Sequence, residues 1–314
     1  MARYRPNPPP PRDGLSPSCV VVPAGAWVNA LEFFATRFTA VAREDWQQRL
    51  DAGDIVDSQG QVLLADGPVQ IGQRIYYYRS LPSEPRVPFE ERIVWQDEHI
   101  VVADKPHFLP VIPSGKYVRE TLLVRLNKAF GTDSLAPAHR IDRDTAGLVL
   151  FTRNPATRNL YHRLFREHQV RKTYHAVARW NPALTWPVTR HTRIAEGSHF
   201  MQQAEVPGPA NALTHIRPIQ QAGAYALYEL QPVTGQRHQL RVHMHALGLP
   251  LVHDGIYPTL TPEGSADTSK PLQLLAKTLA FTDPVTGEPR HFTSGLSLLP
   301  LQDLATDHPA PISD

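Results

Sequence analysis

The 314-residue sequence predicts an α+β fold, with a small separate module at its start. Apolar patterns typical of strands and of helices follow one another without the regular alternation of a doubly wound sheet. The 31 prolines favour short elements with sharp ends over long helices. A polar stretch that contains three prolines between residues 82 and 88 separates the two parts.

The composition excludes several classes of protein. Hydrophobic residues make up 41% of the chain, which is enough to form a core and excludes wholesale disorder. The lone cysteine, Cys19, excludes an intramolecular disulfide and a clustered thiolate metal site. No apolar run reaches the roughly 18 residues of a membrane span, and the N-terminus lacks the features of a signal peptide. We therefore expect a soluble, cytoplasmic protein without a membrane partner.

We predict four consecutive segments. Residues 1–18 are rich in proline and poor in apolar side chains, which indicates an extended, disordered tail. Residues 19–85 form the small α/β module, where helical spacing of apolar residues is followed by strand-like runs between glycines. Residues 86–300 form the main domain, and residues 301–314 form a C-terminal tail.

The first elements of the main domain follow from the apolar pattern. Ile93–Trp95 and Ile100–Ala103 are strand-like runs that a polar turn separates. Val118–Phe130 has the spacing of a helix, which Gly131 closes. Gly147–Thr152 is a short apolar run typical of a buried strand.

Helices and strands continue in irregular order. An Asn-Pro pair begins a helix over residues 154–168, because asparagine caps helices and proline fits their first turn. Strands are predicted at Val170–Val177 and Tyr225–Pro232. A helix over Gln236–Leu247 ends at Gly248. This mixture favours α+β over a regular α/β fold.

Positive charge is concentrated between His139 and Arg179. This segment contains nine lysines and arginines and three acids, although the net charge of the whole chain is only +2. Such a cluster attracts polyanions, and aromatic residues interleaved with it are of the kind that stacks on unpaired bases. A solvated helix face and ordinary core packing explain the same residues equally well.

One short motif in this segment has the chemistry of a reactive carboxylate. Asp142 and Asp144 lie among Arg140 and Arg143, just before the apolar run that starts at Gly147. An aspartate between arginines is ionised at neutral pH and can act as a nucleophile. From the residues alone, a structural ion pair that caps a turn is the alternative.

A second motif spans residues 234–245. On a helix, Arg241 lies with His238 and His245 on a face away from the apolar stripe. The histidines suggest a metal, particularly with a His-Asp pair nearby at 253–254. However, there is no His-Glu-x-x-His pattern, and the neighbouring arginines would repel a cation. We therefore expect no metal site.

Four segments, in the same order, resemble the motifs of RluA-type RNA pseudouridine synthases. Residues 139–148, His-Arg-Ile-Asp-Arg-Asp-Thr-Ala-Gly-Leu, are similar to the family signature His-Arg-Leu-Asp-x-x-Thr-Ser-Gly-Leu. Residues 97–106 resemble its Asp-Glu-x-x-(apolar)-Val-x-x-Lys-Pro segment, and residues 171–174 its Lys-x-Tyr segment. Residues 234–243 are similar to Thr-Gly-Arg-(Thr/Ser)-His-Gln-(Ile/Leu)-Arg-Val-His. The resemblance covers about residues 93–296.

The resemblance implies a mixed, mainly antiparallel sheet with flanking helices and a central cleft. It implies an isomerase that detaches uracil from its ribose, rotates it and rejoins it through carbon 5, without a cofactor. Asp142 would be the nucleophile, attacking the ribose or the base. Tyr174 would lie against the extruded uracil and assist proton removal from carbon 5. Arg241 would pair with Asp142 through two parallel hydrogen bonds.

The resemblance also implies a substrate-binding set, namely His139, Arg140, Thr145, Arg237 and His238. In this chain Gln-Arg replaces the usual Arg-Thr at 236–237, which displaces one arginine by a position. The module over residues 19–85 resembles the αL RNA-binding module of many family members, but acidic residues crowd its second helix. We expect RNA as the partner, with ribosomal RNA favoured over transfer RNA, and a monomer without an obligatory protein partner.

Two other functions are compatible with parts of the sequence. A catalytically idle RNA-binding or ribosome-assembly factor would share this scaffold, although binding alone does not require Asp142, Tyr174 and Arg241 together. A glycoside-cleaving enzyme would need two opposed carboxylates, for which Asp142 and Asp144 are available. The four motifs favour the isomerase over both.

Overall fold

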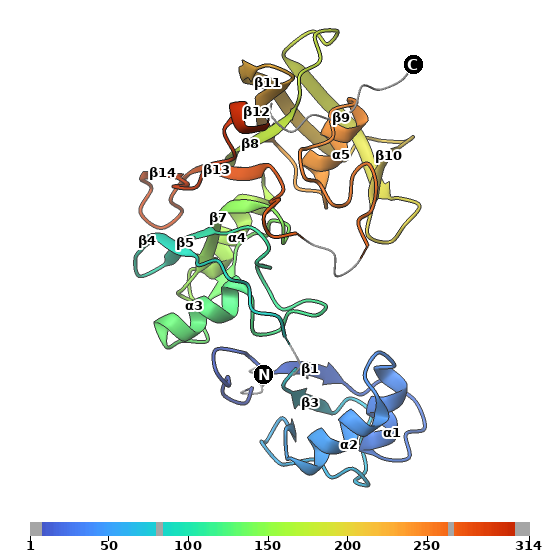
Figure 1. Ribbon diagram of the computed structural model, residues 1–314. Coiled ribbons are helices and arrows are strands. Elements are labelled where there is room, and N and C mark those ends of the chain that lie inside the picture. Colours follow the sequence, from blue (N-terminus) through green and yellow to red (C-terminus); the bar gives the residue numbers. More distant parts are fainter. Residues whose placement is uncertain (1–7, 80–83, 263–266, 305–314) are drawn as a thin grey trace. The chain divides into compact units, whose positions relative to one another are not determined.

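The chain forms two compact units in the computed structural model, which describes residues 8–79, 84–262 and 267–304 (Figure 1). The first unit comprises Met1–Pro85, Pro113–Glu120 and Val124–Asp133, and the second comprises Arg86–Ile112, Thr121–Leu123 and Ser134–Asp314. The first division therefore falls after Pro85, and two later segments, predicted as parts of the main domain, are grouped with the first unit.

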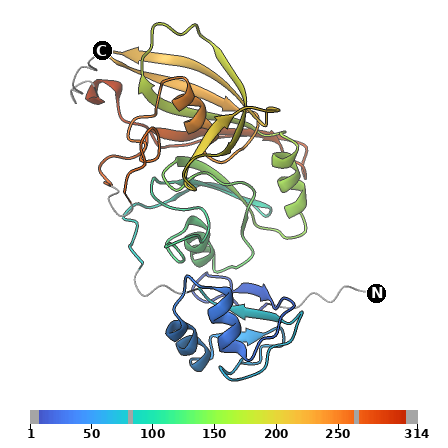
Figure 2. The same ribbon diagram turned by 90° about the vertical axis from the view of Figure 1, so that its right-hand side faces the viewer.

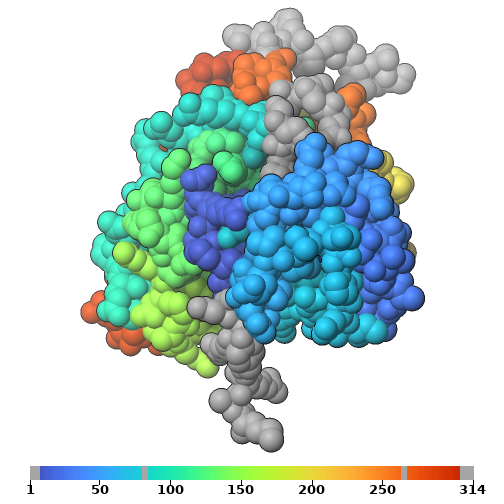
Figure 3. All heavy atoms as spheres, turned by 90° about the horizontal axis from the view of Figure 1, so that it is seen from below, coloured from blue at the N-terminus to red at the C-terminus, as the bar shows by residue number. Residues whose placement is uncertain are grey.

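The described part of the first unit contains a three-stranded antiparallel sheet in the order β1-β3-β2, with two helices. Its elements are β1 (Ser18–Val21), α1 (Ala30–Arg37), α2 (Arg43–Asp51), β2 (Ile55–Asp57) and β3 (Arg74–Tyr77). Helix α1 begins after Asn29, whose side chain accepts a hydrogen bond from the N–H of Glu32 at 2.8 Å. Phe33, Phe34 and Trp46 lie in the core. Figure 3 shows the atoms of the segment that contains them as a compact group of blue and light-blue spheres.

The structure describes part of the predicted N-terminal tail. Residues 1–7 lie outside the described residues. Arg12 and Leu15 pair through their backbones around a turn whose two central residues have positive φ angles. Leu15 is buried, so a single apolar residue anchors a segment whose prolines suggested an extended chain over residues 1–18.

The described part of the second unit is built on an 11-stranded sheet (Figure 1 and Figure 2). The strand order is β10-β9-β11-β12-β8-β13-β7-β5-β4, with β14 beside β13 and β6 beside β7. Neighbouring strands are antiparallel except β13 and β7, which are parallel. This confirms the predicted α+β fold with a mainly antiparallel sheet. The strands are β4 (Arg92–Gln96), β5 (Ile100–Lys105), β6 (Ala136–Pro137), β7 (Ala146–Thr152), β8 (Arg171–Arg179), β9 (Val188–Glu196), β10 (Gln203–Val206), β11 (Ala212–Ala222), β12 (Tyr225–Pro232), β13 (Leu274–Thr282) and β14 (Pro289–Thr293).

The remaining helices are α3 (Leu122–Phe130), α4 (Arg158–Arg166), α5 (Gln239–Ala246) and α6 (Leu301–Leu304). Leu240 of α5 packs in one core cluster with Tyr174, and Leu301 of α6 packs in another with Val177. Because successive side chains of β8 alternate, α5 and α6 cover opposite faces of the sheet. The tail predicted over residues 301–314 therefore begins with a packed helix, and residues 305–314 lie outside the described residues. No helix in the described ranges is long and apolar enough to cross a membrane.

Three helices are shorter than predicted. The helix predicted over residues 118–130 begins at Leu122. At the starts of the other two, polar or strained residues form turns. The helix predicted over residues 154–168 begins at Arg158, since the side chain of Asn154 accepts a hydrogen bond from the N–H of Ala156 at 3.0 Å. The next helix begins after His238, which has a left-handed backbone conformation with a φ of 55°.

Candidate active site

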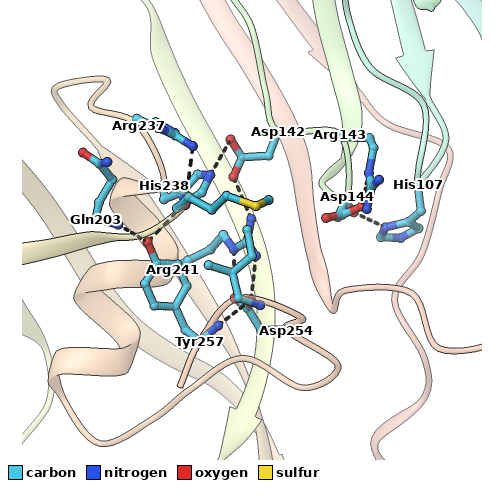
Figure 4. A network of polar contacts seen from close by, with 12 residues as sticks. His107, Asp142, Arg143, Asp144, Gln203, Arg237, His238, Arg241, Asp254 and Tyr257 are labelled. Atoms are coloured by element: carbon cyan, nitrogen blue, oxygen red, sulfur yellow. Dashed lines mark hydrogen bonds and ion pairs between the residues drawn. The ribbon is translucent and has the colours of Figure 1, made fainter. Parts of the chain in front are cut away.

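Asp142 and Arg241 meet although 99 positions separate them in the sequence (Figure 4). Asp142 lies in the turn before β7, where its carbonyl oxygen accepts a hydrogen bond from the N–H of Thr145 at 3.2 Å. Arg241 lies on α5, and its Nη1 donates to Oδ2 of Asp142 at 3.2 Å. The structure therefore brings these two predicted residues together, through one hydrogen bond where the sequence analysis expected two.

The rest of the guanidinium of Arg241 is bound to a carboxylate that the sequence analysis did not assign. Its Nε donates to Oδ2 of Asp254 at 2.8 Å, and its Nη2 donates to Oδ1 at 2.5 Å. Oδ1 of Asp254 also accepts hydrogen bonds from the N–H groups of Ile256 and Tyr257, at 2.8 and 3.1 Å. The side chains of Arg241 and Asp254 are 1% and 0% exposed. Asp254 thus fixes the orientation of the guanidinium in the interior.

His238 presents a second nitrogen to the same carboxylate. The N–H of Gln203 donates to Oη of Tyr257 at 2.7 Å, and this oxygen lies 3.1 Å from Nδ1 of His238 (Figure 4). When the proton of neutral His238 is on Nε2, Nδ1 can accept the hydroxyl proton of Tyr257. Nε2 lies 4.0 Å from Oδ1 of Asp142.

These neighbours keep the carboxylate of Asp142 ionised. Burial raises the pKa of Asp142, but His238, Arg241 and Lys105 outweigh this effect, so that the pKa is lowered overall. Burial lowers the pKa of His238, so this histidine contributes a positive charge beside Asp142 only at acidic pH. Burial also disfavours the charged form of Arg241, but its bonds to Asp254 and the charges of both carboxylates raise the pKa. Arg241 is the permanent cation beside Asp142.

Lys105, at the end of β5, holds the loop that carries Asp142. Its Nζ donates to the carbonyl oxygens of Pro106 and Arg143, both at 2.9 Å. The side chain is fully buried, and burial lowers the pKa of Lys105 to about 7, although Asp144 and Asp142 partly oppose the shift. Because Arg143 follows Asp142 directly, Lys105 positions the backbone of the turn that carries Asp142, which we call the catalytic turn for the role proposed below.

Tyr174 lies on β8 and is 9% exposed. Its ring packs in the cluster that contains Leu240 and Met244 of α5. Burial raises the pKa of the phenol, and the charge of Asp142 raises it further, so the hydroxyl is protonated at neutral pH. The predicted aromatic residue therefore lies within the electrostatic reach of Asp142.

The other predicted substrate-binding residues do not gather at the carboxylate of Asp142. Nε2 of His139 accepts a hydrogen bond from the N–H of Leu150 at 3.1 Å, and its ring stacks on Phe165 with 4.5 Å between centroids. Burial, with the charge of Lys172, lowers the pKa of His139 to about 3, so this histidine is neutral. Thr145 is buried, whereas Arg140 is exposed. Their part in substrate binding stays a prediction.

Arg237 is exposed, and its guanidinium donates to two carbonyl oxygens, those of Phe200 and Met201. Asp144 pairs with Arg143 at 2.8 Å, and its carbonyl oxygen lies 2.7 Å from Nδ1 of His107. Figure 4 shows this second group apart from Asp142. The two aspartates therefore do not oppose each other as the carboxylates of a glycosidase would. Within the described ranges, no group of three or more His, Cys, Asp or Glu side chains could hold a metal ion.

Sequence reasoning missed Asp254 and Tyr257 as parts of the site. Both follow α5 closely in the chain, but Asp254 was weighed only as a metal ligand beside a histidine. Lys105 was quoted within a matched segment without a role. Lys105 lies inside the matched segment 97–106, and Asp254 and Tyr257 follow the segment that carries Arg241. An arginine in the interior requires a buried acceptor, and this requirement was the available signal for Asp254.

Comparison with known proteins identifies relatives of this chain. The family model for RNA pseudouridylate synthases matches residues 99–246, which include Asp142, Tyr174 and Arg241. An uncharacterized RNA pseudouridine synthase of Synechocystis is 33% identical over 240 residues, which are 72% of this chain and 78% of the relative. The dual-specificity RNA pseudouridine synthase RluA of Yersinia pestis is 31% identical over 217 residues, which are 64% of this chain and 96% of the relative.

Solved structures show the same fold. Human RNA pseudouridylate synthase domain containing 4 is 26% identical, with a TM-score of 0.51 over 65% of this chain and 88% of the other. Human RNA pseudouridylate synthase domain containing 1 is 22% identical, with a TM-score of 0.54 over 73% of this chain and 100% of the other. The motifs, the sheet and these relatives agree, and the chain belongs to the RluA-type family of RNA pseudouridine synthases.

Proposed function

We propose that this enzyme converts specific uridines of structured RNA to pseudouridine, with Asp142 as the nucleophile and without a cofactor. The ionised carboxylate of Asp142 carries the proposal, because Arg241 binds it and Asp254 holds Arg241 in place. The side chain of Asp142 is 28% exposed, so a bound base would remove the remaining water from it. The fixed guanidinium would then offset the cost of desolvating the charge.

The atoms of this isomerisation balance without an oxidant or a reductant. The bond between C1′ of the ribose and N1 of uracil breaks, and a bond between C1′ and C5 forms. C5 loses a proton and N1 gains one. As the nucleophile, Asp142 bonds transiently to the ribose or the base and is released when C5 joins C1′.

Tyr174 is proposed to lie against the extruded uracil and to relay the proton from C5. Its hydroxyl is protonated, because burial and Asp142 raise its pKa. The phenol oxygen can therefore accept the C5 proton only while it passes its own proton to another acceptor. The released carboxylate of Asp142 is such an acceptor, and it passes the proton on to solvent, from which N1 takes its own proton.

The basic segment around the site is proposed to bind RNA phosphates. Its exposed members are Arg140, Arg163, Arg166, Arg171 and Arg179. We propose ribosomal RNA as the target and transfer RNA as the second candidate, since relatives are named for each of these substrates. One chain supplies Asp142, Tyr174, Arg241 and Asp254, which supports a monomer that acts without a protein partner.

The test is to map pseudouridines in ribosomal and transfer RNA from cells with and without this gene. Wild-type enzyme should restore every site that is lost, and Asp142→Asn should restore none, because an amide keeps the shape of the side chain but is no nucleophile. If Asp142→Asn restores the sites, Asp142 is not the nucleophile. If purified wild-type enzyme binds the RNA without modifying it, the chain is the idle RNA-binding factor instead.

A further inference from the structure

The hairpin that joins β9 to β10 presents an aromatic side chain to solvent. Residues 197–202 form its tip, in which the N–H of Gly197 donates to the carbonyl of Gln202 at 3.0 Å. Phe200 is 71% exposed, compared with 36% for Phe89, another exposed phenylalanine of the second unit. The ring of His199 lies against Phe200, with 4.5 Å between centroids. Phe200 therefore faces water at a tight turn of the backbone.

Arg237 holds this tip from the turn that begins α5. Its Nη1 donates to the carbonyl oxygen of Phe200 at 3.1 Å, and its Nη2 donates to that of Met201 at 3.4 Å. A planar guanidinium on two successive carbonyls restrains the backbone that carries the exposed ring. This is the arginine that is displaced by one position relative to the family pattern.

Residues at the base of the hairpin donate hydrogen bonds to the loop that contains Tyr257. Nε2 of Gln202 donates to the carbonyl of Ile256 at 2.8 Å, and the N–H of Gln203 donates to Oη of Tyr257 at 2.7 Å. Tyr257 in turn contacts His238, which follows Arg237 directly and faces Asp142. Figure 4 shows Arg237, Gln203 and His238 on one side of this network. Two sets of contacts thus connect the exposed tip to the residues around Asp142. One runs from Gln203 through Tyr257 to His238, and the other is formed by Arg237, which precedes His238.

We propose that the tip is a nucleobase-stacking subsite, in which Phe200 stacks on an unpaired base next to the target uridine and Arg237 is its positioning residue. The inference rests on the proposed RNA substrate. A uridine that leaves its stack requires unpaired or distorted neighbours, and such bases expose a face on which aromatic rings stack. The hydrogen bonds that connect the tip to Tyr257 and Arg237 place the ring next to the proposed site of the target uridine, which supports a nucleobase as the occupant.

The experiment uses a short synthetic RNA stem-loop that contains an unpaired uridine and that the wild-type protein binds. Binding is measured in the Asp142→Asn background, which separates affinity from turnover. Phe200→Leu should weaken binding about tenfold, whereas Phe200→Trp should retain it. The matched control Phe89→Leu should bind like the parent protein. Equal affinity of Phe200→Leu and the parent would overturn the subsite.

Two further comparisons assign the partner of the ring and the role of Arg237. Replacing the base next to the uridine by an abasic site should weaken binding by the parent about tenfold and leave Phe200→Leu unchanged. Arg237→Met should weaken binding like Phe200→Leu, without a further loss in the double variant and without a change in salt dependence. A smaller salt slope would show that Arg237 contacts a phosphate. Because these measurements require binding alone, they give a result even if wild-type turnover contradicts the proposed function.

Discussion

Arg241 directs its Nε and Nη2 to Asp254 and only its Nη1 to Asp142 (Figure 4). An arginine that binds one carboxylate with two nitrogens has a fixed orientation. The nitrogen that meets Asp142 is therefore in place before RNA binds. Asp254 acts through Arg241, and two backbone N–H groups hold Asp254 itself.

Asp254→Asn should impair both stability and turnover. The amide keeps the size of the side chain but leaves the buried cation without its counter-charge, which costs about 3 kcal/mol of unfolding free energy. It should also let the guanidinium turn, so the single-turnover rate at saturating RNA should fall well below that of the wild type. Urea unfolding and single-turnover assays measure the two effects separately.

The control for this variant is Glu167→Gln, which removes a carboxylate that is 44% exposed on its side chain. It should leave both quantities near the wild-type values. A folded Asp254→Asn enzyme with an unchanged saturated rate would show that Asp254 stabilises the chain without positioning Arg241.

Arg241→Lys should be almost as inactive as Arg241→Met. Charge alone would let lysine retain part of the activity, but one ammonium group cannot replace two nitrogens on Asp254 and a third on Asp142. Arg163→Met is the contrasting variant, since the Arg163 side chain is 51% exposed. It should weaken RNA binding and leave the single-turnover rate at saturating enzyme unchanged. Substantial turnover by Arg241→Lys would mean that a point charge suffices.

The resemblance to the family predicted the meeting of Asp142 with Arg241, because both residues lie in matched motifs. The partner of Arg241 could not be predicted in the same way. Asp254 is a lone acid in a loop, and its role follows from backbone N–H groups that only the folded loop directs at it. The expectation of two hydrogen bonds from Arg241 to Asp142 was wrong, because Nε and Nη2 of Arg241 donate to Asp254 and only Nη1 donates to Asp142.

The strands of the larger unit differ in how well the sequence marks them. Strand β7 is buried along its whole length and reads as an apolar run, so it was predicted. Strand β9 has partly buried and exposed residues in near-alternation and carries threonines, arginines and a histidine, which leaves no apolar run to detect. Strand β11 contains Pro218 at an irregularity in its pairing with β12, and a proline argues against a strand in sequence analysis.

Tyr174→Phe should retain RNA affinity and slow the single-turnover reaction. The ring that packs beside α5 is unchanged, but the hydroxyl that we propose as the relay for the C5 proton is lost. Because burial raises the pKa of this phenol, the wild-type rate should show no loss from Tyr174 ionisation up to about pH 10. Unchanged single-turnover kinetics in Tyr174→Phe would show that the hydroxyl is dispensable.

Lys105 should make the stability of the wild-type enzyme depend on pH. Burial lowers the pKa of Lys105 to about 7 in the folded chain, whereas an unfolded lysine has a pKa of about 10.4. Between these values the unfolded state holds the additional proton, so the free energy of unfolding rises with pH by up to about 1.4 kcal/mol per pH unit. Below about pH 7 both states are protonated, and this contribution is constant.

Lys105→Met should remove this rise, so the difference in unfolding free energy between wild type and variant should grow from about pH 7 to about pH 10. Lys172, whose pKa burial lowers to about 8, is present in both proteins, and its contribution cancels. A neutral amine keeps two N–H groups for the carbonyls of Pro106 and Arg143, so the catalytic turn should stay in place as Lys105 loses its charge. Urea unfolding across this range measures the difference, and a constant value would show that Lys105 stays charged in the folded enzyme.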